Sequence, residues 1–335
     1  MRYSEDIIDQ ILKKEVRKIF VFAVSYEDRC IRLPELLSKL NPKRTKNRLI
    51  CIELPDRNVH PLVSVKRKEL KAKIQDLIEP EFSTIDRIKT ILDTEICESV
   101  TKNQETNIII DASGMPRGLI LNILDHIGKS RNQFNRVFLT YSHPKEYLPG
   151  NLEIPSPIIK SLYSFSGVQR SSKVALAIFP GFNISETAVV ISRVVDPDME
   201  EQHVRLFWFL THPGRHYAFY ERSLSEHMVF FKFLEGFRSL EILCRMDDFN
   251  QIGVELIKLA KGIDDDEAFL VANLGPRIIT VPILLTAHAL HAKGRKVDVL
   301  IPQPLFYNSI RSRGFVGKLD VWNLEEEFSS IVNAL

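Results

Sequence analysis

Two arginine-containing turns are the stretches of this sequence best suited to chemistry. Asp111-Ala-Ser-Gly-Met-Pro-Arg117 and Asn273-Leu-Gly-Pro-Arg277 each follow an apolar run and precede a helix-like one. Proline is tolerated at the first helical position, and the free amides of a helix N-terminus bind anions. Arginine adds a planar cation that fits phosphate. The pattern predicts a site for a phosphate-bearing ligand.

Other residues of these turns fit the same chemistry. Gly114 would let the backbone approach a ligand closely, and Ser113 and Asn273 offer hydrogen bonds. A structural interpretation stays open, in which Arg117 pairs with Asp111 or Glu27 and only pins two loops together.

A third polar stretch is Ser25-Tyr-Glu-Asp-Arg29. Tyr26 could stack on a base, and Glu27 or Asp28 could bond a ribose hydroxyl or act as a general base. The alternative is a capping turn in which Asp28 satisfies helix amides. In the second half of the chain the stretch 180–186 takes this place.

The candidate residues divide by role. If the protein is an enzyme, Asp111, Glu27 and His143 would supply acid–base chemistry, although the counterpart of His143 in the second half is Gln303. Two histidine pairs lack a carboxylate or cysteine at ligand spacing, so the sequence predicts no metal site, and it identifies no cofactor. The residues expected to bind the ligand are Ser25, Tyr26, Asp28, Arg29, Ser113, Gly114, Arg117, Gly181, Asn183, Asn273, Gly275 and Arg277.

The elements that would position these residues alternate between strand and helix. In the first half, strands are expected at 18–24, 48–54, 72–78 (weak), 107–110 and 136–140, with helices at 5–17, 60–72 and 82–100 among those between them. Such alternation predicts parallel strands with crossover helices on both faces, in the order 3-2-1-4-5.

The second half repeats this plan. Residues 107–147 align without gaps to 267–307, and the identities include Ala112/Ala272, Pro116/Pro276 and Arg117/Arg277. We therefore expect an α/β protein with two tandem Rossmann-like domains and mainly parallel sheets, related by internal duplication. The expected domains are 1–147 and 173–335, the latter with a C-terminal tail that holds a basic loop at 311–318. Residues 148–172 would be a linker with a short strand near 158–163.

This architecture indicates where a ligand would bind. Ligands of open parallel sheets lie outside the carboxyl ends of the strands, where the strand order reverses. With the order 3-2-1-4-5 that point lies between strands 1 and 4, and the polar turns follow those strands in both halves.

Composition narrows the function classes. The chain has 335 residues, 44% of them hydrophobic, and a formal charge of +2, so no global field attracts nucleic acid. Its four cysteines form no CxxC pair, and a polar N-terminus without long apolar runs predicts a cytoplasmic protein with no membrane segment. The absence of a Walker loop, a GxGxxG after a strand and a nucleophile elbow argues against common ATPases, dehydrogenases and hydrolases.

The tandem plan, with ligand loops after strands 1 and 4, resembles the CARF family (CRISPR-associated Rossmann fold) of nucleotide sensors. The turn 111–117 is similar to the strand-4 turn of that family, with Arg117 in place of its lysine, whereas 273–277 departs further. The resemblance implies binding of cyclic oligoadenylates at a two-fold interface, and a role in anti-phage signalling.

Three functions follow as hypotheses. A cytosolic sensor would bind a nucleotide-like anion and act through a protein partner carrying an effector, as a single chain or a homodimer. An enzyme would hydrolyse or transfer a nucleotide, including cleavage of a cyclic oligonucleotide. A scaffold would bind another protein, with structural loops only.

Overall fold

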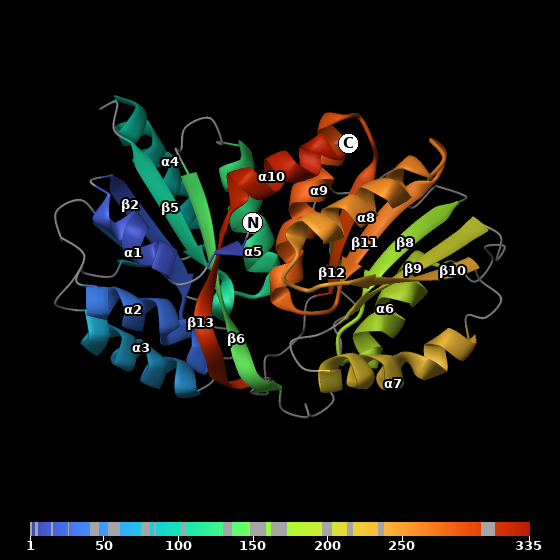
Figure 1. The fold of residues 1–335 in the computed structure, drawn as a ribbon, viewed down its shortest axis with the longest axis horizontal. Coiled ribbons are helices and arrows are strands. Elements are labelled where there is room, and N and C mark those ends of the chain that lie inside the picture. The colour runs from blue at the N-terminus through green and yellow to red at the C-terminus, as the bar shows by residue number, and fades with distance from the viewer. Residues whose placement is uncertain are drawn as a thin grey trace. The chain divides into compact units, whose positions relative to one another are not determined.

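The computed structural model shows two compact units, 1–153 with 306–326 and 154–305 with 327–335 (Figure 1). The described residues are 2–3, 6–14, 16–25, 27–40, 47–52, 61–74, 81–83, 85–101, 105–129, 136–147, 159–161, 173–195, 203–212, 217–233, 238–302 and 312–335.

The first unit is built on a sheet in the order β1-β13-β6-β5-β2-β3-β4. The five strands from β4 to β6 are parallel, β13 is antiparallel to β6, and β1 is antiparallel to β13. The parallel part has the predicted order 3-2-1-4-5. Its strands are β1 (Arg2–Tyr3), β2 (Arg17–Ala23), β3 (Asn47–Ile52), β4 (Glu81–Ser83), β5 (Thr106–Asp111), β6 (Arg136–Tyr147) and β13 (Ser312–Asn323).

Crossover helices cover both faces of this sheet (Figure 1). The apolar runs become strands buried on both sides, and β5 is buried at every residue. Phe20 and Phe22 of β2 pack with α1, α2 and Leu70 of α3 in one core cluster. The helices are α1 (Asp6–Lys13), α2 (Arg32–Leu40), α3 (Pro61–Ile74), α4 (Ile85–Thr101) and α5 (Arg117–Lys129), with short 3-10 turns η1 (Asp28–Ile31) and η3 (Ala112–Gly114).

The second unit repeats the plan in the order β10-β9-β8-β11-β12-β7, in which only β7 is antiparallel. Its strands are β7 (Ile159–Ser161), β8 (Val174–Phe179), β9 (Val204–Thr211), β10 (Arg238–Cys244), β11 (Ala268–Asn273) and β12 (Val297–Pro302). Its helices are α6 (Ile184–Val194), α7 (Tyr217–Phe233), α8 (Phe249–Lys261), η7 (Arg277–Ile279) and α9 (Thr280–Ala292), and α10 (Leu324–Asn333) begins in the first unit.

Two predicted elements of the first unit were misplaced. The weak strand predicted at 72–78 is wrong, because α3 continues through Ile74 and the third strand is β4, while 75–80 lie outside the described residues. The helix predicted to begin at 82 begins at Ile85, because Phe82 belongs to β4. A strand predicted near 158–163 is present as β7, at the edge of the second sheet.

The C-terminal segment differs most from expectation. The stretch predicted as a basic loop is mostly β13, since Ser312–Asn323 pairs along β6. This pairing places 306–326 in the first unit, whereas the sequence assigned all of 173–335 to the second domain. Ser312 pairs with Tyr147, so the chain leaves the first sheet after β6 and returns beside the same point.

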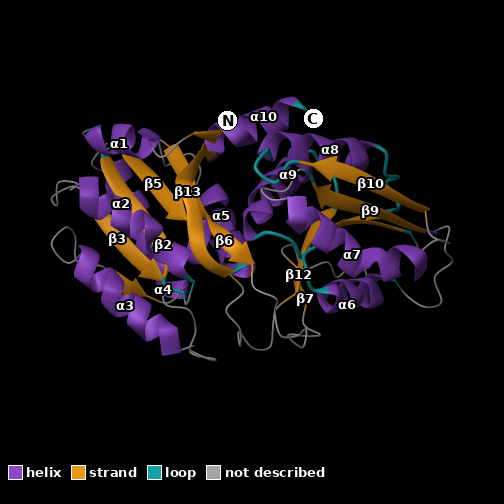
Figure 2. Cartoon of the chain, turned by 60° about the horizontal axis from the view of Figure 1, so that its bottom comes forward, coloured by secondary structure: helices purple, strands orange, loops and turns teal. Residues whose placement is uncertain are grey.

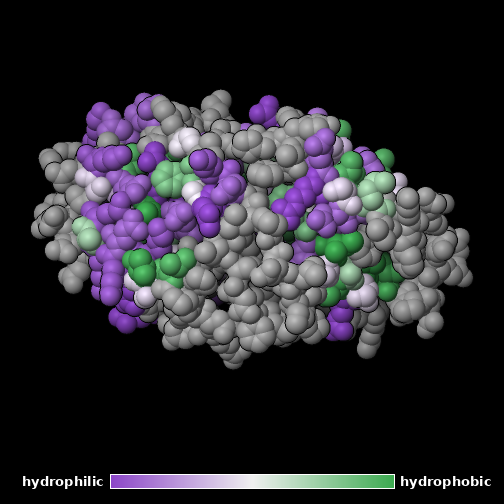
Figure 3. All heavy atoms as spheres, turned by 90° about the horizontal axis from the view of Figure 1, so that it is seen from below, coloured by the Kyte–Doolittle hydropathy of each residue, from purple (hydrophilic) through white to green (hydrophobic). Residues whose placement is uncertain are grey.

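Basic side chains of α3 face solvent. Arg67, Lys68 and Lys71 of α3 are exposed. Hydrophilic residues cover much of the described surface of the first unit on the side drawn in Figure 3. Among the described helices, none combines the length and the apolar character needed to cross a membrane.

Candidate functional site

The polar residues of the first unit gather where β2 and β5 end. Phe22 pairs with Asp111, so the two strands end level and their following turns meet. Gly114 makes this contact possible, because a Cβ atom there would lie 2.3 Å from the carbonyl oxygen of Ala23. Gly114 was expected to allow close approach to a ligand. In the structure it allows close approach to the protein's own backbone at Ala23.

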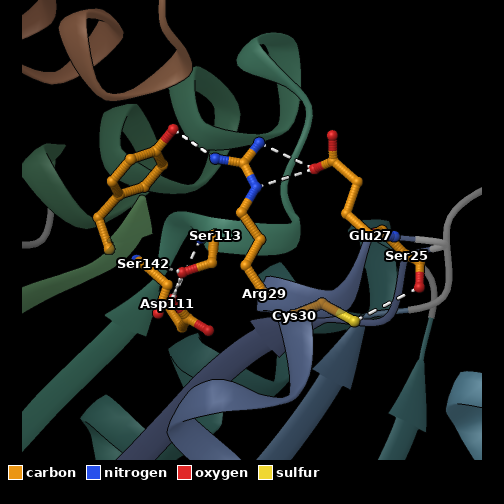
Figure 4. Close-up of polar contacts among 8 residues, drawn as sticks. Ser25, Glu27, Arg29, Cys30, Asp111, Ser113 and Ser142 are labelled. Atoms are coloured by element: carbon orange, nitrogen blue, oxygen red, sulfur yellow. Dashed lines mark hydrogen bonds and ion pairs between the residues drawn. The ribbon is translucent and has the colours of Figure 1, made fainter. Parts of the chain in front are cut away.

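Asp111 is the centre of this cluster and is fully buried (Figure 4). Its Oδ1 accepts hydrogen bonds from the Ser113 amide (3.1 Å), the Ser113 hydroxyl (2.5 Å) and the Thr140 hydroxyl (3.3 Å). Among the described residues, no group donates to its Oδ2. Burial raises the pKa of Asp111 to about 6, although the bonds from Ser113 and Thr140 and the charge of Arg29 lower it.

Ser113 ties this turn to the neighbouring strand. Its hydroxyl donates to Asp111 and accepts a 2.8 Å hydrogen bond from the Ser142 amide in β6. All three residues are buried. The serine predicted to contact a ligand thus has its hydrogen-bonding capacity used inside the protein.

Glu27 and Arg29 form a buried ion pair, with 1% and 2% of their surfaces exposed. The Arg29 Nε and Nη2 atoms donate to Oε2 of Glu27 at 3.0 and 2.8 Å, and Nη1 donates to the Tyr141 phenol at 2.5 Å. Separating the two side chains would leave a buried charge without a partner, which is costly. The pair therefore holds the loop after β2 in place. The structural interpretation had Arg117 pairing with Asp111 or Glu27, and in the structure Glu27 pairs with Arg29.

Cys30 lies beneath the same loop. Its thiol donates to the Ser25 carbonyl at 3.4 Å, and burial raises its pKa to about 11. The thiol therefore stays protonated at neutral pH, which is typical of a structural cysteine.

His143 is buried against the C-terminal strand. Its Nε2 lies 2.7 Å from Oδ2 of Asp320 in β13, and its ring meets Tyr141 edge-on at 4.9 Å. Asp320 could not be paired with His143 from the sequence, because it lies 177 positions away, just after the predicted loop 311–318. Tyr141 was also missed. The only signal in the sequence was its position two residues before His143, which places both side chains on the same face of a strand.

Asp28 faces outward and does not cap a helix with its side chain, contrary to the capping interpretation. Its carboxylate accepts a bond from the Gly314 amide (3.0 Å) and pairs with Lys66 of α3 (3.0 Å). Burial raises the pKa of Asp28, but the bonds from Gly314 and Lys66, with the charges of Lys66 and Arg313, hold it below its usual value.

The second unit uses glycine in the same way. A Cβ atom at Gly181 would lie 2.2 Å from the Leu274 carbonyl oxygen, and one at Gly275 would lie 3.0 Å from that of Pro180. Asn183 caps α6 by accepting the Ser185 amide at 3.1 Å. These residues shape the two turns at the end of β8 and β11.

Asn273 occupies the place of Ser113 and is fully buried. Its Nδ2 donates to the Thr280 hydroxyl at 2.7 Å, and its Oδ1 has no hydrogen-bond partner among the described residues. The carboxylate of the first unit has no counterpart here, because Val271 aligns with Asp111. The two sites have therefore diverged in charge.

A histidine that the sequence analysis missed anchors the second site. The Ser223 carbonyl can only accept, so Nδ1 of His227 donates to it (2.8 Å) and Nε2 accepts from the Thr187 hydroxyl (2.8 Å). Burial lowers the pKa of His227. The Ser223 hydroxyl also donates to the Gly181 carbonyl at 3.1 Å, which joins α7 to the loop. The signal available in the sequence was the spacing of Ser223 and His227, which are four residues apart and so lie on one face of a helix.

The predicted site residues separate by exposure. Tyr26 lies outside the described residues. The partly exposed ones are Asp28, Arg117, Gly181, Asn183 and Arg277. The buried ones are Ser25, Glu27, Arg29, Asp111, Ser113, Gly114, His143, Asn273 and Gly275.

No group of three or more His, Cys, Asp or Glu side chains within the described part of the chain could hold a metal ion. No protein-family model and no curated protein matches the sequence. A universal stress protein from Archaeoglobus fulgidus DSM 4304 is a structural match at 10% identity and a TM-score of 0.24, over 85% of this chain and 96% of that one. A similarity this low supports no statement about function.

Proposed function

We propose that the protein is a sensor that binds a nucleotide-like or other phosphate-bearing ligand at the turns following the first and fourth strands of its units. The observation that supports this proposal is the difference in exposure between the candidate catalytic residues and the two turn arginines. Glu27, Asp111 and His143 are buried, whereas Arg117 and Arg277 are partly exposed.

Two of the candidate catalytic residues are bonded to other side chains of the protein. Glu27 pairs with Arg29, and His143 bonds Asp320, so neither presents a free group to a substrate. A general base must come within hydrogen-bond reach of the proton it removes. The buried network fits a rigid support for the turns better than a catalytic centre.

The partly exposed groups suit an anion. Arg117 begins α5, and the Pro116 carbonyl accepts the first helical bonds from Leu119 and Ile120. Arg277 begins η7 in the equivalent position. The first amides of a helix have no partner within it and attract negative charge. Each turn thus offers a position for a phosphate of the ligand, and the signal would pass to an effector-bearing protein partner.

An enzyme acting on a nucleotide is the second candidate, supported by Asp111. A buried carboxylate with a pKa near 6 and an oxygen without a donor is typical of functional acids as well as of structural ones. Turnover that disappears in Asp111→Asn would favour this candidate.

Thermal unfolding with mono-, di- and cyclic oligonucleotides tests the sensor. A ligand that binds only the native state raises the melting temperature. We expect the rise to be lost in Arg117→Ala or Arg277→Ala and kept in Arg136→Ala and Arg193→Ala, which remove exposed arginines from the first residue of β6 and the last turn of α6. No rise with any nucleotide would overturn the proposal, and chromatography of the ligand after incubation separates sensor from enzyme.

A further inference from the structure

β10 is the longest of the four strands that stand at the ends of the two sheets. Sheets expose four end strands, and three are short: β1 has 2 residues, β4 has 3 and β7 has 3. β10 has 7 residues and lies at the end of the second sheet, as Figure 2 shows. Proteins usually shorten or charge such edges to prevent pairing with another chain. A long edge strand therefore offers unpaired N–H and C=O groups to a strand of another chain.

The backbone of β10 has a definite outward side. The Cys244 carbonyl accepts from the His212 amide at 2.8 Å, so Leu240, Ile242 and Cys244 direct their backbone groups at β9. Backbone direction alternates along a strand, so Ser239, Glu241 and Leu243 direct theirs outward.

One end of this edge is already covered. The Gln251 side chain donates to the Leu243 carbonyl at 3.5 Å and accepts from the Arg245 amide at 2.9 Å. Among the described residues, no hydrogen bond reaches the outward backbone of Ser239 or Glu241. The segment open to pairing is therefore centred on Leu240.

The side chains here are also exposed. Leu240 and Leu243 expose 53% and 51% of their surfaces, and Ser239 and Glu241 are exposed. Exposed leucine on an open edge favours association.

We propose that β10 is a dimerisation edge that pairs antiparallel with β10 of a second copy of this chain, about a two-fold axis at Leu240. Charge and hydrogen bonding select this register. An axis at Glu241 would place two carboxylates directly opposite, which is destabilising. An axis at Leu240 places Ser239 opposite Glu241 of the second copy, twice, so that each hydroxyl can donate to a carboxylate. The two leucines then form the closely spaced pair on the axis.

Cysteine cross-linking tests the register. The two Leu240 Cα atoms would lie roughly 4.5 Å apart, within the range that a disulfide spans. The two Leu243 Cα atoms would lie about 20 Å apart along the strands. In a chain carrying Cys97→Ser, Leu240→Cys is therefore expected to form a disulfide-linked dimer under mild oxidation. Leu243→Cys in the same chain, and the Cys97→Ser chain itself, in which Cys30, Cys51 and Cys244 are buried, are not.

Sedimentation of the full chain tests the association itself. Leu240→Lys should convert the dimer to a monomer, because lysine blocks an edge, and half-exposed Leu240 is not needed for folding. The control Val65→Lys, at an equally exposed site on α3, should stay dimeric. A monomeric parent chain, or cross-linking through Leu243→Cys but not Leu240→Cys, would overturn the proposal.

Discussion

Asp111 holds its proton more tightly in the folded protein than in the unfolded chain, because burial raises its pKa from 3.8 to about 6. Between these values the folded state binds more protons, so the stabilisation from the protonated carboxyl is lost as the pH rises through this window. A shift of this size corresponds to roughly 3 kcal/mol. The ionised carboxylate should therefore lower the free energy of unfolding at neutral pH.

Urea unfolding of the parent chain and Asp111→Asn measures this effect. The difference in free energy of unfolding should change by about 3 kcal/mol, in favour of the variant, between roughly pH 4 and pH 7. Asp86→Asn, which removes an exposed carboxylate from α4, should show no such window. A difference that does not vary with pH would show that folding leaves the pKa of Asp111 unchanged.

The sequence located this cluster but not its internal partners. Ser25, Asp111 and Ser113 were placed together because strands 1 and 4 of such a sheet are neighbours, and the pairing of β2 with β5 confirms it. Their burial could not be predicted, since it depends on Tyr141 and on the strand that carries Asp320. Long-range contacts of this kind leave no local pattern.

At the scale of elements, the turns of each unit depend on backbone contact through glycine. Gly114→Ala would place its new methyl group 2.3 Å from the Ala23 carbonyl oxygen, where the backbone at the end of β2 cannot move aside easily. Overpacking of this kind typically costs about 1–3 kcal/mol. Chemical denaturation should therefore show Gly114→Ala to be destabilised by at least that amount.

Gly262→Ala is the matched control. It ends α8 with a negative φ of −90°, and its added methyl group would meet only ordinary contacts of 3.5 Å or more. We expect a change near zero or a gain of about 0.4–1 kcal/mol from lower entropy of the unfolded chain. Equal effects of the two substitutions would contradict the close-packing role of Gly114.

The predictability of the elements follows from their burial. Strands buried on both faces were found from continuous apolar runs such as 19–23. β4 was missed because three residues carry no periodicity, and β13 because its first half, with exposed Arg313 and Gly317, has the composition of a loop. What identifies β13 is its pairing with β6, which depends on the whole fold.

At the scale of the molecule, residues 154–305 of the second unit are inserted between two segments of the first, and residues 327–335 return to the second unit. β6 and β13 are antiparallel neighbours, and their facing ends are Tyr147 and Ser312. They would form a hairpin if the chain did not run through the second unit between them. Insertion is tolerated where the two ends of the inserted domain lie at one surface point.

The insertion makes β13 essential to the first unit. Leu319 and Val321 of β13 are fully buried and belong to the same core cluster as Phe20 and Phe22 of β2. A chain of residues 1–147 alone would lose these contacts and expose the edge of β6. We expect it to lack a cooperative unfolding transition, because deleting several buried apolar side chains exceeds the stability of an ordinary domain.

Joining residues 1–147 directly to 312–326 through Asn-Gly should restore folding. A two-residue Asn-Gly turn suits an antiparallel hairpin, and the pairing of Tyr147 with Ser312 places the ends at the distance such a turn spans. Circular dichroism during heating should show a single cooperative transition for the joined chain and none for 1–147. If the joined chain also fails to fold while Leu319 and Val321 are present, the first unit depends on the second and the insertion is not separable.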